Sequence, residues 1–405
     1  MSYFKSDRYN RLPSEKFKQG GTKTLYKIVL IHPNAGMNWN GNSENFAIEI
    51  ARRLDNYFEV ELLSGADCGS FSRPIKSISR TKLLNWKYFP LIKPVLSRWF
   101  DRPEVAIEHL TTFLPCLSYL LRHPADLIFP QNDYGGLLVA NCIRAIRGTP
   151  ILFAEHNSLS GQGKSLRRNL SLHPSRLVVT HPAMAKYIKH VAPEQIFDVI
   201  PYGIDITEFT PVGKAMATGL SKPTVLCVAP LERNSNQRLE LAIAAVARLP
   251  QVSLLICGDG RDRAYFQEQG DRLLGARRFR IKAFAYAQMP QVYRSANIFT
   301  LPSLEASLGL TYLEAMACGL PVVATDDAVR RYLIGNAGIT CDVTDIDIYA
   351  ESIQIALERC WHQLQPRTNA LDFSWQEIAL RYRQTALRTI VQSNKNFMIS
   401  TSQGG

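Results

Sequence analysis

Residues 301–327, LPSLEASLGLTYLEAMACGLPVVATDD, combine a loop and a short helix in a pattern that suits anion binding. The apolar run before the loop predicts a buried strand. The helix after it ends at Gly319, a residue type that favours the left-handed conformation of a helix C-terminus. The start of the helix, at Gly309, Leu310 and Thr311, presents backbone N–H groups without helical partners at the positive end of the helix dipole. These groups predict a site for a diphosphate.

A carboxylate follows one turn into the same predicted helix, at Glu314. Its two oxygens can accept hydrogen bonds from both hydroxyls of a vicinal diol such as a ribose. A second strand, SLLICGDG, ends in a G-x-G turn with Gly258 and Gly260, a pattern that also fits a plain strand-ending turn. Because open α/β sheets bind ligands at the carboxyl ends of their strands, these features together predict a nucleotide site.

The stretch resembles the donor-site signature of family 4 retaining glycosyltransferases. Further segments follow in the order of that family: DVIPYGIDITEFTP (198–211), LLICGDGRDR (254–263), ATDDAVRRYLIGNAGITCDVTD (324–345) and FSWQEIALRYRQTALRTI (373–390). The resemblance covers roughly residues 25–392 and is stronger in the C-terminal half. It implies transfer of a hexose from a UDP- or GDP-sugar to an acceptor hydroxyl with retention of configuration. It also implies that neither a catalytic metal nor a further cofactor is needed.

Three positions depart from the family. The Glu that the family carries three residues before the loop glycine is Ala306 here, and Glu305 lies one residue earlier. A one-residue shift in an extended loop turns a side chain the other way, and a bulge could turn it back, so Glu305 is a candidate catalytic substitute. Pro230 and Ser235 replace an Arg and a Lys that contact the donor diphosphate in the family.

Arg233 and Arg238 lie close to the two replaced positions in the sequence. The sequence leaves two interpretations open for them, a substitute diphosphate contact or ordinary solvated arginines. Near the N-terminus, WNGNSENF matches the family's glycine-rich loop, with Gly41 kept and Asn42 in place of a second Gly. Asn42 is expected to cap the helix that follows or to contact phosphate.

Three polar residues at strand ends are candidates for sugar and acceptor contacts. His156, in FAEHNS, resembles the His that faces the transferred sugar in the family, and a neutral imidazole could bond a hydroxyl or move the acceptor proton. A structural role for His156 is the alternative. Asn132 and Asp133 end the preceding strand and are expected on the acceptor side.

The segment 71–102 interleaves aromatic and basic residues. From Arg73 to Arg102 it carries eight cationic residues and one acidic residue, Asp101. Interfacial aromatics beside Lys and Arg favour an anionic bilayer surface, which would bring a lipid-linked acceptor to this half of the chain. The alternative is a pair of ordinary amphipathic helices, because Pro90 and Pro94 interrupt a continuous helix.

The elements that must position these residues alternate between strands and helices. Apolar runs predict strands at 27–33, 58–64, 126–131, 150–156, 176–181, 224–230, 253–260, 278–284, 298–303 and 321–326. Runs without polar alternation are typical of parallel strands covered on both faces. The pattern predicts an α/β fold with parallel sheets. The resemblance to family 4 glycosyltransferases implies that this fold is of the GT-B type, with two Rossmann-like, doubly wound parallel-sheet domains facing across a cleft. The domains are predicted as a disordered tail (1–24), an N-terminal acceptor domain (25–205), a C-terminal donor domain (220–372), a helix crossing back (373–392) and a second tail (393–405).

Composition narrows the class of protein. The chain of 405 residues carries a net charge of +12, has no apolar run long enough to span a membrane and lacks a nucleic-acid motif. Scattered cysteines, none in a C-x-x-C pair, favour a reduced, cytoplasmic protein. The aromatic and basic residues of 71–102 favour a peripheral position on the cytoplasmic face of a membrane. Nucleotide sugar and a sugar or lipid-linked acceptor, such as a cell-envelope glycan, are the expected partners. The main alternative is a catalytically degenerate GT-B protein that binds nucleotide sugar or a partner without efficient turnover, and an epimerase or a phosphorylase is a third.

Overall fold

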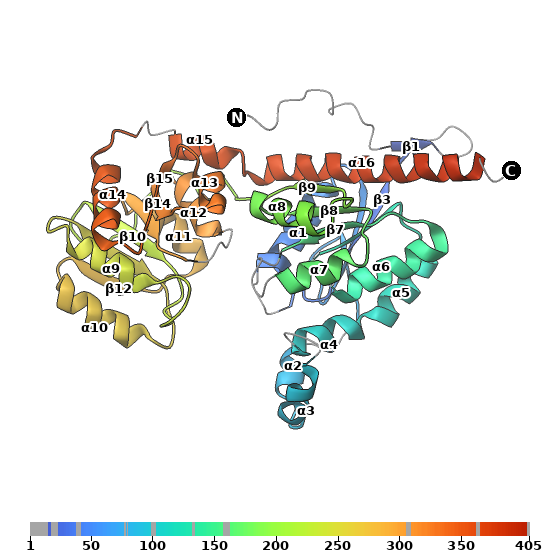
Figure 1. The fold of residues 1–405 in the computed structure, drawn as a ribbon, viewed down its shortest axis with the longest axis horizontal. Helices are drawn as coiled ribbons and strands as arrows, with labels where there is room; N and C mark the ends of the chain where they lie inside the picture. Colours follow the sequence, from blue (N-terminus) through green and yellow to red (C-terminus); the bar gives the residue numbers. More distant parts are fainter. Residues whose placement is uncertain are drawn as a thin grey trace. The chain divides into compact units, whose positions relative to one another are not determined.

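The computed structural model describes residues 15–17, 23–37, 42–76, 78, 80–98, 103–131, 134–156, 163–304, 309–361 and 365–402. The chain forms two compact units, which Figure 1 shows as two separate sheets with helices around each. Unit 1 comprises the chain up to Thr180, residues 184–200 and the chain from Ala379, and unit 2 comprises residues 181–183 and 201–378.

Unit 1 is built on parallel strands. Its strands are β3 (Lys27–His32), β4 (Glu59–Ser64), β5 (Ser72–Pro74), β6 (Leu127–Pro130), β7 (Leu152–Glu155), β8 (Arg176–Val179) and β9 (Phe197–Val199). They form sheets of order β5-β4-β3-β6 and β7-β8-β9, and parallel bridges from Ile128 to Ile151 and from Gln131 to Ala154 join β6 to β7. The result is one doubly wound sheet whose winding direction changes between β3 and β6.

Helices cover the sheet of unit 1 and bury its apolar residues. They are α1 (Asn42–Leu54), α2 (Arg80–Leu84), α3 (Phe89–Leu96), α4 (Pro103–Thr111), α5 (Phe113–Arg122), α6 (Tyr134–Arg147), α7 (Lys164–Leu170) and α8 (Pro182–Val191). Strand residues such as Val29 and Ile128 meet Leu120, Ile143 and Ile188 of the helices in a common core. Strands β6, β7 and β8 are buried along their whole length, as predicted for parallel strands covered on both faces.

Unit 2 contains a six-stranded parallel sheet of order β12-β11-β10-β13-β14-β15. The strands are β10 (Thr224–Val228), β11 (Ser253–Cys257), β12 (Phe279–Lys282), β13 (Ile298–Leu301), β14 (Val322–Thr325) and β15 (Gly338–Cys341). The helical elements are α9 (Leu239–Ala247), α10 (Arg263–Leu273), η3 (Tyr286–Gln288), α11 (Met289–Tyr293), α12 (Leu310–Ala317), α13 (Ala328–Ile334), α14 (Ile346–Glu358) and α15 (Gln365–Leu371). Each strand run predicted from the sequence contains a strand, so the prediction of parallel-sheet α/β architecture is confirmed.

Both ends of the chain differ from the predicted tails. Strand β1 (Glu15–Phe17) lies within the predicted tail of residues 1–24 and pairs antiparallel with β2 (Lys23–Leu25), which lies at the end of that tail. Helix α16 (Trp375–Ser402) continues past residue 392, because the polar residues after it include no Pro or Gly to stop a helix before Gly404. The part of α16 from Ala379 packs on unit 1, where Tyr382 lies 5.5 Å from Phe46 between ring centroids.

Candidate functional site

Unit 2 changes its winding direction between β10 and β13. From β10 the chain proceeds to β11 and β12 on one side, and from β13 it proceeds to β14 and β15 on the other. The loops that leave β10 and β13 are tied together, because Leu304 N donates to Asn236 O at 2.8 Å. A point of this kind is where open α/β sheets bind ligands, and it is where the sequence places the diphosphate and ribose residues.

Helix α12 begins at Leu310 directly after this loop, as predicted. Gly309 caps it with φ +41°, and a Cβ added there would lie 2.6 Å from the Tyr312 ring, so a glycine is required by both conformation and space. Gly309, Leu310 and Thr311 are each partly exposed. They lie at the positive end of the helix, and the role of their amides as a diphosphate site stays a prediction.

Glu314 lies one turn further along α12 and is 5% exposed. Two tyrosines hold its carboxylate: Tyr293 Oη donates to Oε2 at 2.6 Å, and Tyr286 Oη donates to Oε1 at 3.2 Å. An ionised carboxylate has about four lone-pair sites, so two acceptor positions remain for further donors. The two tyrosines fix the orientation of a group that keeps the capacity to accept from a diol.

Burial raises the pKa of the Glu314 carboxyl, with a smaller contribution from Glu208, and the two tyrosine hydrogen bonds oppose this shift. Burial and the neighbouring Glu314 also raise the pKa of Tyr293 and of Tyr286, so both hydroxyls keep their protons and act as donors. Sequence reasoning missed both tyrosines. The available signal concerns Tyr293 alone, because it is fully buried and a buried tyrosine hydroxyl needs a hydrogen-bond partner, whereas Tyr286 is 61% exposed.

The arginines of the loop after β10 have local partners. The Arg233 guanidinium lies 4.1 Å from the centroid of the Tyr265 ring, and its backbone N donates to Asp262 at 2.7 Å. Arg238 precedes α9 with φ +47° and pairs with Glu240. Neither contact involves the first turn of α12, so a diphosphate contact by these arginines stays a prediction.

Gly258 and Gly260 allow the backbone after β11 to approach the backbone after β10. Hydrogen bonds from Ala229 N to Cys257 O (3.1 Å) and from Leu231 N to Asp259 O (3.0 Å) continue the strand pairing into these loops. A Cβ on Gly258 would lie 1.9 Å from Ala229 O, and one on Gly260 would lie 2.4 Å from Leu231 O. The spacing of these glycines therefore has a packing cause, whether or not they also contact a donor.

In unit 1, the carboxyl ends of the central strands carry buried polar groups. His156 follows β7, its Nε2 lies 3.2 Å from Gln131 Oε1, and its ring lies 4.7 Å from Phe46 between centroids. Burial lowers the pKa of His156 to about 3, and neighbouring His32 contributes, so the imidazole is neutral at physiological pH. Both side-chain polar atoms of buried Asn34 and Nε2 of buried Gln131 have no hydrogen-bond partner within the described part of the chain. These amides, which the sequence analysis did not single out, are suited to bind hydroxyl groups of a sugar.

The low pKa of His156 predicts a measurable loss of stability in acid. His156 takes up a proton near pH 6.5 in the unfolded state and only near pH 3 in the folded state. Its contribution to the free energy of unfolding is therefore fully present above pH 6.5 and decreases as the pH falls from 6.5 to 3. The slope from this group is about 1.4 kcal/mol per pH unit. The free energy of unfolding, measured with urea at several pH values, should therefore depend less steeply on pH in His156→Gln than in the wild type. Equal slopes would show that His156 takes up its proton in the folded protein.

The structure describes few of the remaining candidate residues. Gly41, Asn132, Asp133 and Glu305 lie outside the described residues. Asn42 is the first residue of α1, in agreement with a position at a helix start, and its side chain is not described. The roles assigned to these residues stay predictions.

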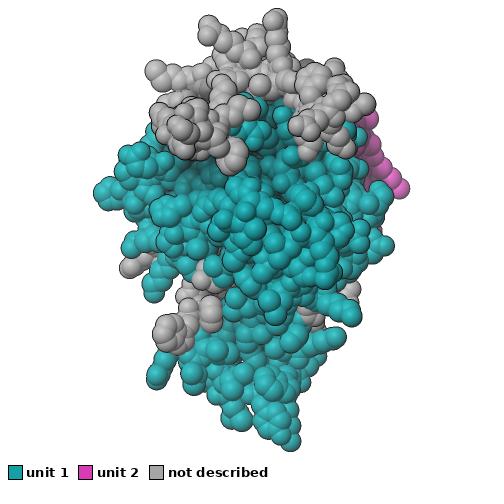
Figure 2. All heavy atoms as spheres, turned by 90° about the vertical axis from the view of Figure 1, so that its right-hand side faces the viewer, with its two compact units in different colours: residues 1–180, 184–200, 379–405 teal, residues 181–183, 201–378 magenta. Residues whose placement is uncertain are grey.

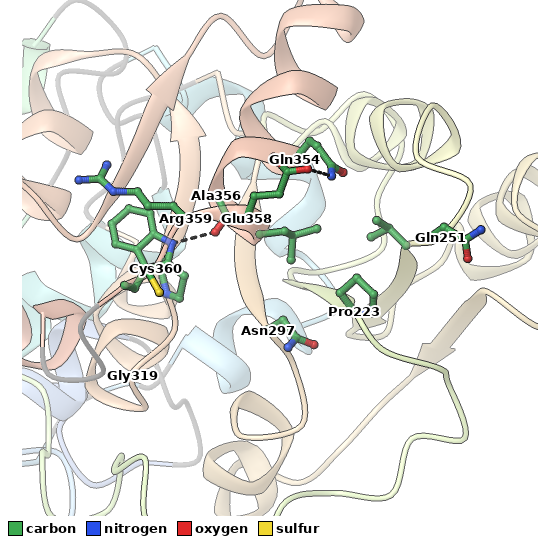
Figure 3. Close-up of a pocket in the computed structure, with 13 residues that line it drawn as sticks. Pro223, Gln251, Asn297, Gly319, Gln354, Ala356, Glu358, Arg359 and Cys360 are labelled. Atoms are coloured by element: carbon green, nitrogen blue, oxygen red, sulfur yellow. Dashed lines mark hydrogen bonds between the residues drawn. The ribbon is translucent and has the colours of Figure 1, made fainter.

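A cavity of about 520 Å³ lies at the opposite, amino-terminal edge of the sheet of unit 2 (Figure 3). Its walls include Pro223 and Asn297, which precede β10 and β13, and the end of α14. The Trp361 side chain in its wall has a local partner, because Nε1 donates to Ala356 O at 2.7 Å. None of the candidate donor residues that the structure describes lines this cavity.

Comparison with known proteins supports the resemblance seen in the sequence. Residues 222–359 match the family model described as Glycosyl transferases group 1. A phosphatidyl-myo-inositol mannosyltransferase of Mycolicibacterium smegmatis is 35% identical over 168 residues, which are 39% of this chain and 42% of that protein. The chain spans about half the length, or less, of the curated relatives that it matches. The resemblance to glycosyltransferases is thereby confirmed, most directly for unit 2.

Solved structures show the same fold. Sucrose-phosphate synthase from Thermosynechococcus elongatus has a TM-score of 0.68 at 19% identity and covers 89% of this chain and 98% of its own. The Anabaena protein HepE in complex with UDP and glucose has a TM-score of 0.62 at 20% identity, with 89% and 99% covered. These likenesses confirm the GT-B fold predicted from the sequence. No helix within the described part of the chain is long and apolar enough to cross a membrane.

Proposed function

We propose, from the match of residues 222–359 to the glycosyl transferases group 1 family, that this chain is a retaining glycosyltransferase. It would move a hexose from a UDP- or GDP-sugar to a hydroxyl of a glycan or lipid-linked acceptor. The observation that supports this most is Glu314, a buried carboxylate held by two tyrosines on the helix that follows the switch point of unit 2. The relative from M. smegmatis, named for transfer of mannose to phosphatidyl-myo-inositol, supports the acceptor class.

In this proposal unit 2 binds the donor. Glu314 accepts hydrogen bonds from the ribose hydroxyls at the two positions that the tyrosines leave open. The amides at Gly309, Leu310 and Thr311 stabilise the negative charge that grows on the diphosphate as the sugar departs. The loop before them carries Glu305, which remains the candidate for the missing family carboxylate.

Unit 1 contributes neutral polar groups in the same proposal. His156, uncharged at physiological pH, can bond a sugar hydroxyl or receive the acceptor proton. Gln131 orients it, and the amide of Asn34 offers further bonds to sugar hydroxyls. The scheme is written without a metal ion or a further cofactor, and the absence of both stays a prediction from the sequence.

A second candidate function is binding of nucleotide sugar without efficient turnover. It is favoured by the local partners of Arg233 and Arg238, which leave the replaced positions Pro230 and Ser235 without an evident cationic substitute. Loss of two charge-assisted hydrogen bonds to a diphosphate would cost about 3–6 kcal/mol. If the chain is an active enzyme, the backbone amides at the start of α12 must make most of the contacts with the diphosphate. Otherwise Arg233 and Arg238 must leave their present partners when the donor binds.

Thermal unfolding with a panel of UDP-, GDP- and ADP-sugars tests the proposal. One nucleotide class is expected to stabilise the full chain, by about 2.7 kcal/mol at a ligand concentration 100 times Kd. Free nucleoside diphosphate should then be released when the preferred sugar is incubated with the protein and an acceptor extract. Stabilisation without release would support the binding protein, and the absence of stabilisation by every member of the panel would contradict both functions.

A further inference from the structure

Helix α3 of unit 1 turns an apolar face to solvent. Tyr88, Leu91, Ile92 and Val95 follow the spacing of one helical face, and they are 54%, 73%, 37% and 61% exposed. A helix on a globular protein normally buries a stripe of this kind against the core. Here the residue that packs inward is Phe89, on another side of the helix and 1% exposed.

Further apolar residues are exposed just before α3. Trp86, in the turn, lies 6.2 Å from Tyr88 between ring centroids, and Leu84, the last residue of α2, is also exposed, while Leu83 is buried and anchors α2. Figure 1 shows α2 and α3 beyond α4, at the end of unit 1 away from its sheet, and Figure 2 shows unit 1 narrowing toward the same end. We call residues 80–98 the α2–α3 hairpin. Its position lets it reach a flat surface without hindrance from the rest of unit 1.

Exposed positive charges lie along the same segment. Lys82, Lys87 and Arg98 are exposed on the α2–α3 hairpin, and Lys76 is exposed just before it. The sequence from 71 to 98 contains no acidic residue. Lys93 pairs with Glu104 of α4 at 3.6 Å, and Lys82, Lys87 and Arg98 have exposed side chains.

We propose that the α2–α3 hairpin is a docking surface for an anionic lipid bilayer, with the apolar face of α3 inserted at the headgroup boundary. An exposed apolar stripe that includes Tyr88, the Trp86 ring next to Tyr88, and a group of exposed lysines on the same segment are the chemistry that an anionic interface binds. A protein partner fits less well, because lysine is depleted at the centres of protein interfaces. A second copy of this chain would bring like charges together, since each copy carries +12.

This inference goes beyond the proposed function and does not rest on it, because vesicle binding needs no donor or acceptor. If both hold, the hairpin would place unit 1 at the surface where a lipid-linked acceptor is available. Failure of vesicle binding would leave the donor-panel result untouched, and failure of the donor panel would leave the vesicle result untouched.

Co-sedimentation of the full chain with vesicles tests the surface. Vesicles of phosphatidylcholine mixed with phosphatidylglycerol should bind the protein, and pure phosphatidylcholine vesicles should bind it far less. Lys82→Gln with Lys87→Gln should weaken binding about 30-fold, from about fivefold per charge near an anionic surface. Leu91→Gln with Val95→Gln should weaken it about 100-fold, because two inserted apolar side chains are lost.

Matched pairs elsewhere on the chain are the controls. Val212→Gln with Ile146→Gln replaces side chains that are 77% and 61% exposed, nearly the same as Leu91 and Val95, and Lys186→Gln with Lys189→Gln removes two exposed charges from α8. Both control pairs should bind vesicles more tightly than the corresponding hairpin pair. Equal loss in hairpin and control variants, equal binding to neutral and anionic vesicles, or capture of a protein partner with no vesicle binding would each overturn the proposal.

Discussion

Replacing Glu314 with glutamine is expected to weaken binding of the donor nucleotide sugar by about 100-fold. A charged acceptor makes hydrogen bonds roughly twice as strong as a neutral one, so two ribose bonds lose about 1.4 kcal/mol each when the carboxylate becomes an amide. The amide also brings a donor toward Tyr293 and Tyr286, whose hydroxyls both donate to Glu314 in the structure. Calorimetric titration with the sugar selected by the donor panel measures the change.

Two further variants separate recognition from folding. Glu268→Gln, on the exposed side of α10, removes a carboxylate of the same type from unit 2 and should leave the donor affinity unchanged. Tyr293→Phe keeps the Glu314 carboxylate and removes one of its two donors, so it should cost less affinity than Glu314→Gln. An unaltered Kd for a Glu314→Gln protein that melts at the wild-type temperature would contradict the proposed ribose contact.

The raised pKa of Glu314 also sets a pH dependence for donor binding. In the folded protein, Glu314 takes up a proton at a higher pH than an ordinary glutamate does. The ionised carboxylate therefore lowers the free energy of unfolding at neutral pH, and this loss disappears as the pH falls through the raised pKa. A protonated carboxyl no longer accepts two hydroxyl donors. Donor affinity should therefore decline in acid above the ordinary glutamate pKa of 4.5, and Glu314→Gln should lack this decline.

The strands that the sequence predicts are those with an apolar run of several residues. Runs such as VLIH and LLIC are recognisable because parallel strands are covered on both faces. Strands β5 and β9, with sequences SRP and FDV, were not predicted, because three residues carry no periodic signal. They become strands because β5 pairs with β4 and β9 pairs with β8. This pairing depends on the folded sheet and cannot be read from the three residues themselves.

The position of Glu314 could be predicted because a strand, a loop and a helix follow each other locally. Its environment could not, because Tyr286 and Tyr293 reach it from η3 and α11, elements that only tertiary packing brings to α12. The same holds for Arg233, whose contact with Tyr265 depends on how α10 packs beside the loop after β10. Sequence reasoning thus located the candidate site and missed the contacts that give its groups their charge and orientation.

Gly258→Ala is expected to destabilise the protein by about 3 kcal/mol, the upper range for a forced steric overlap in a packed region. The added Cβ would lie 1.9 Å from Ala229 O, a backbone atom that cannot rotate away. If the loop after β10 or the loop after β11 moved to relieve this overlap, a backbone hydrogen bond to a neighbouring segment would break. Ala229 N donates to Cys257 O, and Gly258 N donates to Lys282 O, each at 3.1 Å.

Gly148→Ala is the matched control, and equilibrium urea unfolding is the measurement. Gly148 has φ +70° and no atom within 4 Å of an added Cβ, so its replacement costs only about 1–2 kcal/mol for the left-handed backbone. A loss at Gly258 no larger than that at Gly148 would contradict the close approach of the two loops. Because the loop after β10 leads to Asn236, which binds the loop before α12, strain at Gly258 should also lower donor affinity in the protein that remains folded. The glycine would then serve the candidate site through the backbone that positions it, without touching the donor.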